Sequence, residues 1–231
     1  MTDWHSHILP GVDDGSSNVE ESLTMLGMLS EQGVDTVVAT PHFGANDESA
    51  TRFLDRRNEA FQTLSRSLNG TEPRILLGAE VRYYPGICRM ADIDKLRVSG
   101  SKLLLLEMSM ERWTEYTIRE LVELASSPDI RLMLAHVERY IRFQSKDSME
   151  RLYDNGIMMQ VNASFFNEAG TRRKALGMLR SGEIQFIGSD CHNVRSRPPK
   201  IGRAAEIIEK KFGSEFLNQM SEYGNAMLDK I

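Results

Sequence analysis

Cysteine is scarce in this sequence. The 231 residues include two cysteines, Cys88 and Cys191, and these do not form a Cys-x-x-Cys pair. This scarcity excludes a disulfide framework and a zinc site built from thiolates. It is typical of a protein that works in a reducing compartment, so we expect a cytoplasmic location.

Excess positive charge and long apolar runs are also missing. The 28 lysines and arginines are outnumbered by 33 aspartates and glutamates, which gives a formal net charge of −5. A protein that binds the phosphate backbone normally carries a basic stripe, so nucleic acid is a poor candidate partner. No apolar stretch has the length that a bilayer requires. We also expect no removable leader, because His5 is already a candidate metal ligand. We therefore expect no membrane insertion.

Short apolar segments with the length of strands recur along the chain, separated by longer segments with helical periodicity. The strands are expected at residues 3–7, 35–40, 74–79, 103–106, 131–135, 157–161 and 184–188. The helices are expected at residues 18–32, 51–68, 114–126, 145–154, 171–181, 202–212 and 214–229. This alternation predicts parallel strands with right-handed crossovers, in a single α/β domain that spans residues 1–231.

Polar side chains stand at or just past the ends of these strands. His42, Glu80, Glu107, His136 and Asp190 each follow a different strand. Seven strand–helix units could form an open doubly wound sheet or a closed barrel. An open sheet concentrates its ligands at one crevice, whereas a barrel gathers all strand ends around one axis. The distribution therefore favours a barrel.

All five histidines of the chain lie at these strand ends. His5 and His7 are two residues apart, so in a strand both imidazoles leave the same face. Taken singly, such a residue could equally be a surface histidine or a satisfied polar group of the core. Glu107, however, follows four leucines, where an ionised carboxylate is costly unless a cation or several donors meet it. The set as a whole therefore predicts a metal site.

The ligand types in this set indicate which ions it would hold. Imidazole and carboxylate without thiolate suit manganese, iron or zinc better than magnesium. With one carboxylate from Asp13-Asp14 these groups number nine, which is too many for one ion, and carboxylates bridge ions readily, so we expect two or three ions. A site of this kind holds a bridging hydroxide and clamps the oxygens of a displacement at phosphorus. Phosphoester hydrolysis is therefore the leading chemistry.

Several motifs occur in a specific order: His5-Ser6-His7, Asp13-Asp14-Gly15, residues 39–42, residues 78–80, Glu107, residues 135–140, residues 189–193 and residues 197–199. In order, spacing and total length they resemble the polymerase-and-histidinol-phosphatase (PHP) superfamily. Within it, they are similar to the bacterial manganese-dependent tyrosine-protein phosphatases of capsule and exopolysaccharide operons. The resemblance covers essentially the whole chain. It implies a distorted (β/α)7 TIM-like barrel with three divalent ions, manganese first, with iron or zinc also open.

By this resemblance, nine side chains hold the three ions. The first ion takes His5, His7, Glu80 and Asp190; the second shares Glu80 and adds Glu107 and His136; the third takes Asp14, His42 and His192. The sequence alone leaves open whether Asp13 or Asp14 points inward, and the resemblance favours Asp14. Cys191 stands between two of these ligands, where we expect a small buried residue without a redox role.

Two arginines, Arg139 and Arg197, match those that such phosphatases use on the phosphate. A planar guanidinium pairs two phosphate oxygens at once and stabilises charge on the transferring group. The alternative for Arg139 is an ordinary ion pair with Glu138 or another neighbour. Arg195 shares the loop of Arg197, so the assignment of Arg197 is less specific.

The expected function is hydrolysis of phosphotyrosine monoesters without a phosphorylated enzyme. A phenolate leaves readily, so a strong general acid is less essential than for an alkyl phosphate. The resemblance implies the tyrosine-rich tail of a bacterial tyrosine autokinase as the partner. Two alternatives stay open: a phosphatase of a small metabolite such as histidinol phosphate, and a non-enzymatic module that keeps the barrel as a scaffold. A complete ligand set argues against the second.

Two further groups of residues have more than one interpretation. Met25 and Met28 lie beside the inner face of the first predicted helix, where they could serve a homo-oligomer contact, although core packing is favoured. Aromatic residues that follow strand ends could line a groove for an aromatic substrate: Tyr83, Tyr84, Trp113, Tyr140, Phe165 and Phe166. Packing is the expected role of at least half of them.

Overall fold

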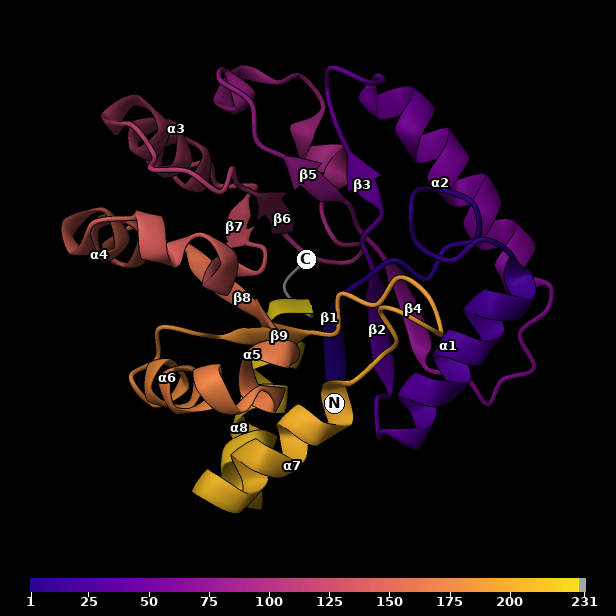
Figure 1. Cartoon of the computed structure of the whole chain (residues 1–231). Coiled ribbons are helices and arrows are strands. Elements are labelled where there is room, and N and C mark those ends of the chain that lie inside the picture. Colours follow the sequence, from indigo (N-terminus) through magenta and orange to yellow (C-terminus); the bar gives the residue numbers. More distant parts are fainter. Residues whose placement is uncertain (229–231) are drawn as a thin grey trace.

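Parallel strands form the centre of the protein, and helices surround them (Figure 1). The computed structural model describes residues 1–228. One sheet has the order β1 (Thr2–Ser6), β2 (Thr36–Ala39) and β4 (Arg74–Leu77). The second has the order β3 (His42–Phe43), β5 (Glu80–Arg82), β6 (Leu103–Glu107), β7 (Arg131–Leu134), β8 (Met158–Asn162) and β9 (Phe186–Gly188). Together they make a curled parallel arrangement, a half-barrel, which confirms the α/β class and the parallel strands.

Each predicted strand region overlaps a strand, and a second short strand follows two of the regions. The region at 35–40 continues past Pro41 as β3, and the region at 74–79 continues past Ala79 as β5. Proline has no N–H to give to a ladder, so Pro41 interrupts the pairing. Beyond the interruption, His42 pairs with Glu80 in the second sheet. The two predicted site residues thereby become direct neighbours.

The first strand and the segment after the last strand also lie side by side. The backbone N–H of Asp190 donates to the carbonyl of His5 at 2.8 Å, and the N–H of His7 donates to the carbonyl of Cys191 at 2.9 Å. Ser6 and Cys191 form an isolated parallel bridge. These bonds join segments that are far apart in the sequence, at the end of the strands where the polar residues were predicted.

The helices lie where the sequence predicts them, with one addition. Their bounds are α1 (Val19–Glu31), α2 (Ala50–Ser65), α3 (Glu115–Ala125), α4 (Lys146–Asp154), α5 (Ser164–Asn167), α6 (Ala169–Arg180), α7 (Ile201–Phe212) and α8 (Ser214–Leu228). The short helix α5 was not predicted, and residue 229 of the last predicted helix lies outside the described residues. Asn18 caps α1, because its side-chain oxygen accepts a 2.9 Å hydrogen bond from the N–H of Glu21. Gly33, at φ 77°, follows the end of this helix.

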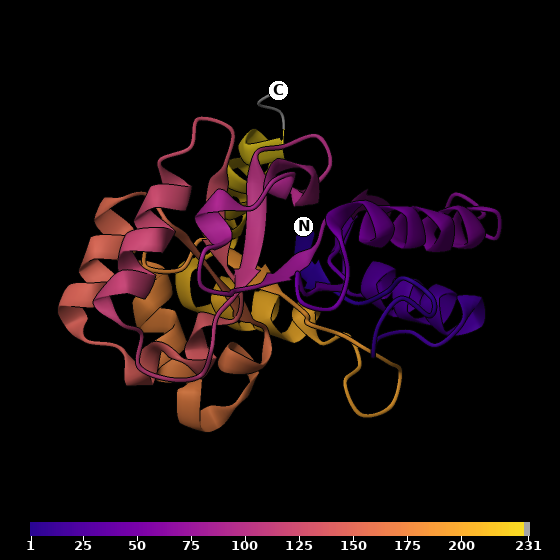
Figure 2. The same cartoon turned by 90° about the horizontal axis from the view of Figure 1, so that it is seen from above.

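The helices are unevenly distributed around the strands. Figure 2 shows α1 and α2 side by side on one flank, with α3, α4 and α6 on the other. Met25 of α1 is fully buried, so packing is its role in this chain. Among residues 1–228, no helix combines the length and the apolar content that a membrane crossing requires.

An apolar cluster lies beneath the polar ends of the strands. Leu103 and Leu105 of β6 belong to it, together with side chains from the neighbouring strands and Met227 of α8, whereas Leu104 and Leu106 pack into a second, larger cluster under the helices. All four leucines are fully buried, which confirms burial on both faces of this strand. Because strand side chains alternate, Glu107 continues the face of Leu103 and Leu105. The apolar cluster therefore forms the floor of the site.

Candidate metal centre

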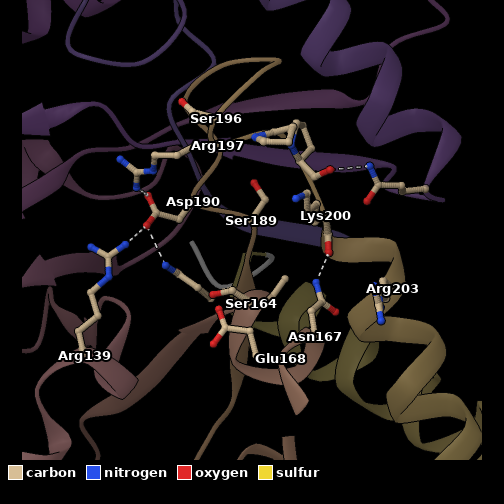
Figure 3. Close-up of a pocket in the computed structure, with 15 residues that line it drawn as sticks. Arg139, Ser164, Asn167, Glu168, Ser189, Asp190, Ser196, Arg197, Lys200 and Arg203 are labelled. Atoms are coloured by element: carbon tan, nitrogen blue, oxygen red, sulfur yellow. Dashed lines mark hydrogen bonds and ion pairs between the residues drawn. The ribbon is translucent and has the colours of Figure 1, made fainter. Parts of the chain in front are cut away.

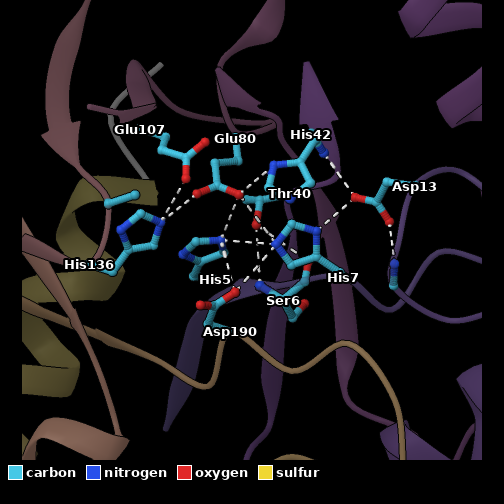
Figure 4. Close-up of polar contacts among 12 residues, drawn as sticks. His5, Ser6, His7, Asp13, Thr40, His42, Glu80, Glu107, His136 and Asp190 are labelled. Carbon is cyan, nitrogen blue, oxygen red and sulfur yellow. Dashed lines mark hydrogen bonds and ion pairs between the residues drawn. The ribbon is translucent and has the colours of Figure 1, made fainter. Parts of the chain in front are cut away.

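His5 and His7 lie at the centre of the polar cluster that Figure 4 shows. Both are fully buried, and their Nε2 atoms are 3.1 Å apart. Oε2 of Glu80 lies 3.3 Å from each of these nitrogens. Oδ1 of Asp190 lies 3.7 Å from Nε2 of His5 and 3.5 Å from Nε2 of His7. The four side chains expected for the first ion therefore converge.

Glu80 connects this group to the residues on β6 and β7. Its Oε1 lies 2.7 Å from Nε2 of His136, and its Oε2 lies 2.9 Å from Nδ1 of His42. Oε1 of Glu107 is 3.6 Å from Nε2 of His136. Glu80 is 1% exposed and touches histidines from three segments of the chain. It has the position that a bridging carboxylate needs.

The structure separates the roles of the two neighbouring aspartates. Oδ1 of Asp14 lies 3.4 Å from Nε2 of His42 and 3.5 Å from Nε2 of His192. Asp13 instead accepts a 2.7 Å hydrogen bond from Nδ1 of His7 and a 2.9 Å bond from the backbone N–H of His42. Asp14 therefore faces the open side of the cluster, and Asp13 orients His7 through the ring nitrogen that points away from the cluster.

All nine predicted ligands belong to groups compact enough to hold an ion. The groups are His7–Asp14–His42–His192, His5–His7–Asp190, His5–Glu80–His136 and His42–Glu80–Glu107. These groups overlap, because His5, His7, His42 and Glu80 each belong to two of them. The four groups therefore do not coincide with the three ligand sets that the family resemblance implies, although they contain the same nine residues.

An unpaired atom and a close pair of nitrogens in the described chain show that these residues fit cations. Nε2 of His192 is buried without a hydrogen-bond partner. Such atoms are costly unless something binds them. The Nε2 atoms of His5 and His7 also face each other 3.1 Å apart, a distance that needs a proton or another cation between them. Nitrogen and oxygen donors without sulfur suit manganese, iron or zinc.

The pKa values of the histidines and acids show how strongly the cluster attracts positive charge. Burial lowers the pKa of His7, but its contacts with Asp13 and Glu80 outweigh burial and raise the pKa to about 10. Burial raises the pKa of Glu80, but the charge of His5 and the hydrogen bonds from His136 and His42 hold it well below its usual range. Burial and the charge of His7 lower the pKa of His192 to about 4. The cluster thus keeps its carboxylates ionised and stabilises only part of its imidazoles as cations.

Gln160 and Asn162, which were not predicted as site residues, support the cluster from β8. Oε1 of Gln160 accepts a 2.8 Å bond from the backbone N–H of His136 and lies 3.2 Å from Nδ1 of His5. Nδ2 of Asn162 donates to Oδ2 of Asp190 at 2.7 Å. Both are buried. The sequence did carry a signal for these two residues, because polar side chains at alternating positions interrupt the otherwise apolar strand β8.

Two of the converging residues have left-handed backbone conformations. His136 has φ 34° and Asp190 has φ 51°. Residues with a Cβ rarely adopt this region, at a cost on the order of 1–3 kcal/mol each, and such residues cluster at functional sites. The turn after β7 and the turn after β9 therefore direct these two side chains into the cluster.

Both predicted arginines lie against the same carboxylate. Nη2 of Arg139 donates to Oδ2 of Asp190, and Nη2 of Arg197 lies 2.8 Å from Oδ1 of the same residue. Of the alternative ion pairs for Arg139, the one with Glu138 does not form among the described residues, whereas one with Asp190 does. Burial raises the pKa of Glu138 to about 7.

Cys191 and Arg197 have the Cys-x5-Arg spacing of thiol-based tyrosine phosphatases, so the expectation that the chain lacks such a loop is wrong. The geometry excludes that chemistry here. Cys191 is fully buried, and burial raises the pKa of its thiol far above the usual value. A nucleophilic cysteine needs an accessible thiolate with a lowered pKa. Cys191 is therefore a packing residue, as expected.

Most of the aromatic residues after strand ends pack in the core. Tyr140 and Phe166 are fully buried, Phe165 is 5% exposed and Trp113 is 6% exposed. Tyr83 is partly buried, and its hydroxyl donates to Glu120 at 2.7 Å. The expectation that at least half of the six are packing residues is confirmed. The buried side chains of Tyr140, Phe166, Phe165 and Trp113 do not line an aromatic groove.

A family model described as capsular polysaccharide synthesis, CpsB/CapC, matches residues 1–228. The chain belongs to the CpsB/CapC family. One relative is tyrosine-protein phosphatase CpsB from Streptococcus pneumoniae, which is 30% identical over 236 residues, with 93% of this chain and 92% of that protein covered. Another is tyrosine-protein phosphatase YwqE from Bacillus subtilis, which is 29% identical, with 99% of this chain and 91% of that protein covered.

Solved structures resemble this CpsB/CapC protein in fold. One belongs to the pair YwqE from Bacillus subtilis and CpsB from Streptococcus pneumoniae, described as unique metal-dependent tyrosine phosphatases. It has a TM-score of 0.84 at 24% identity and covers 100% of this chain and 96% of that chain. Histidinol phosphate phosphatase from Lactococcus lactis, complexed with zinc, L-histidinol and phosphate, has a TM-score of 0.57 at 12% identity and covers 91% of this chain and 93% of that chain. At these identities the likeness concerns the fold, and function has to be argued from the site.

Proposed function

We propose that this CpsB/CapC protein is a metal-dependent protein-tyrosine phosphatase that hydrolyses phosphotyrosine monoesters. The observation that carries the proposal is the convergence of five histidines and four carboxylates, one of which is the buried Glu80. The names of the relatives support it, because proteins about 30% identical over nearly the whole chain are tyrosine-protein phosphatases. A complete ligand set argues against a module that has lost its activity.

The cluster holds three divalent ions, with manganese favoured and iron or zinc as alternatives. The ligands are those implied by the family resemblance: His5, His7, Glu80 and Asp190; Glu80, Glu107 and His136; Asp14, His42 and His192. Ions in such a site lower the pKa of bound water and neutralise charge on a phosphoryl group. Glu80 supplies two oxygens that face different histidines, which suits a bridge between two of the ions.

Arg139 and Arg197 bind the phosphate of the substrate. Both guanidinium groups reach Asp190 from different directions, and each keeps further N–H donors for other acceptors (Figure 3). Asp190 thus orients both arginines beside the ion cluster. Their donors pair phosphate oxygens and stabilise the charge that develops during transfer. Because tyrosine ionises with a pKa near 10, the leaving phenolate needs little help from a general acid.

Residues 1–231 belong to a single domain of the distorted (β/α)7 TIM-like type. The support is the order of the parallel strands and the bonds that His5 and His7 make with Asp190 and Cys191. A barrel gathers strand ends around one axis, which suits a site built from six segments of the chain. The protein works in the cytoplasm, which both free cysteines suit.

The partner is a phosphotyrosine protein, specifically the tyrosine-rich tail of a tyrosine autokinase that regulates capsular or exopolysaccharide synthesis. The support is the description of the family, capsular polysaccharide synthesis, and the activity that the relatives' names give. A homo-oligomer is compatible with this role, but Met25 offers no contact for one because it is buried.

The alternative is a PHP-family phosphatase of a small metabolite such as histidinol phosphate. It shares the fold of the Lactococcus lactis enzyme, at a TM-score of 0.57. Turnover of a phosphotyrosine peptide and of histidinol phosphate by the manganese-loaded protein separates the two. We expect a kcat/KM at least tenfold higher for the peptide, and a preference for histidinol phosphate would contradict the proposed function.

A further inference from the structure

A cavity of about 740 Å³ opens beside the ion cluster. Figure 3 shows Arg139 on one side of it and Arg203 on the opposite side, with Ser189 between them. Its walls come from the turn after β9, the start of α7 and the short helix α5. The volume lies within the range of about 300–1,000 Å³ that small-molecule sites occupy. One phosphate held by Arg139 and Arg197 fills only the inner end.

The outer wall of this cavity carries two cations that are available for a ligand. Lys200 and Arg203 are both exposed. Among residues 1–228, neither forms an ion pair with an acidic side chain. Apart from Asp190, which Arg139 and Arg197 already neutralise, the acid in the lining is the exposed Glu168. The cavity is therefore cationic in a chain whose formal net charge is −5.

Hydrogen bonds fix the backbone that carries these two cations. Nδ2 of Asn167 donates to the carbonyl of Lys200 at 2.9 Å. Gln32 donates from Nε2 to the carbonyl of Pro199 at 3.1 Å and accepts from the N–H of Gly202 through Oε1 at 2.9 Å. Contacts from Gln32, which follows α1, and from Asn167 of α5 thus hold the start of α7 in place, so an anion meets positions that are already ordered.

We propose that Lys200 and Arg203 bind an anionic group on the peptide that flanks the target phosphotyrosine. The group is a carboxylate or a second phosphate, since both offer oxygens to lysine and arginine. This inference rests on the proposed function and extends it to the choice of substrate. The cavity is continuous from Arg139 and Arg197 to the outer wall, so one peptide can reach both pairs of cations. The lining contains no aromatic side chain, so charge is what this wall can recognise.

The test measures the turnover of matched peptides by the manganese-loaded protein. Three phosphotyrosine peptides differ only in their flanks, which carry alanine, glutamate or a non-hydrolysable phosphonate analogue of phosphotyrosine. The variant is Lys200→Gln/Arg203→Gln. Its control is Arg173→Gln/Lys174→Gln, which removes two exposed cations of α6 that do not line the cavity. Turnover of 4-nitrophenyl phosphate, which has no flank, reports the state of the ion cluster in every protein.

We expect the unaltered protein and the control to favour an acidic flank over alanine by about 2- to 30-fold in kcat/KM, the range for two exposed ion pairs. The Lys200→Gln/Arg203→Gln variant should lose this preference. If only the phosphonate flank raises kcat/KM, the anionic group that Lys200 and Arg203 bind is a phosphate. If the glutamate flank raises it as well, negative charge of either kind is sufficient. Equal rates for all flanks, or a preference that survives in the variant, would overturn the inference while the proposed function stands. Absence of turnover with every substrate would overturn both.

Discussion

The side-chain oxygen of Gln160 lies 3.2 Å from Nδ1 of His5 and accepts a hydrogen bond from the backbone N–H of His136. Because an N–H points at this atom, it is the amide oxygen and not the amide nitrogen. An oxygen accepts, so Nδ1 of His5 carries a proton, and Nε2 is the nitrogen left for an ion. A single buried amide therefore fixes which nitrogen of His5 faces the cluster.

Replacement of this amide should weaken ion binding. We expect Gln160→Leu to lower the affinity for manganese about 10- to 100-fold, the usual effect of removing a group that orients a ligand. A competition titration against a chelating dye measures the affinity, and circular dichroism checks the fold. Gln219→Leu, at an exposed position of α8, serves as the control. Equal affinities in both variants would contradict the role given to Gln160.

Asp14 and Asp13 should differ in what their loss does. Asp14→Ala removes a carboxylate oxygen between His42 and His192, so we expect the purified protein to hold one ion fewer. Its side chain is 67% exposed, so the unfolding temperature of the ion-free protein should change little. Metal analysis by mass spectrometry counts the ions, with the exposed Asp55→Ala as the control. An unchanged count in Asp14→Ala would return Asp13 as the candidate ligand.

The two arginines should act on turnover without acting on ion content. We expect Arg139→Ala and Arg197→Ala each to lower kcat on 4-nitrophenyl phosphate by about 10²- to 10³-fold, because each removes a donor to the phosphoryl oxygens. Steady-state kinetics and metal analysis are measured on the same samples. Arg142→Ala removes a nearby exposed guanidinium that stacks on Phe143 and should behave as the unaltered protein. Loss of ions together with activity would assign the arginines a structural role.

Ion binding should become weaker as the pH falls. Burial lowers the pKa of His7, but Asp13 and Glu80 raise it to about 10, so near pH 7 this imidazole holds a proton that an ion must displace. Lower pH favours the proton, and we expect about a tenfold loss of apparent affinity per pH unit for each proton displaced. Isothermal titration in buffers with different ionisation enthalpies counts the protons. Binding without proton release, at an affinity independent of pH, would contradict this prediction.

The positions of the strands and helices could be predicted from the sequence because their patterns are local. The run 103–106 is apolar throughout, and both of its faces are buried. The short strand β3 after the region 35–40 could not be predicted, because it pairs with a different neighbour from β2. The short helix α5 lacked a signal, since four residues are too few to show a periodicity.

The proximity of the nine polar residues was also predictable, because parallel strands bring their carboxyl ends together. The choice between Asp13 and Asp14 was not, since both lie in an irregular turn whose backbone decides which carboxylate reaches His7 and which faces His42. A binding role for Lys200 and Arg203 could not be predicted either, because exposed cations at the start of a helix are common and only the structure places these two beside a cavity. The binding of ions by the nine residues stays a prediction.

The most direct measurement is phosphate release from a phosphotyrosine peptide by the protein before and after its ions are removed with a chelator. We expect turnover to fall to background in the stripped protein and to return when manganese is restored to three ions per chain. Full turnover by the stripped protein would contradict the central claim that ions held by these nine side chains hydrolyse phosphotyrosine.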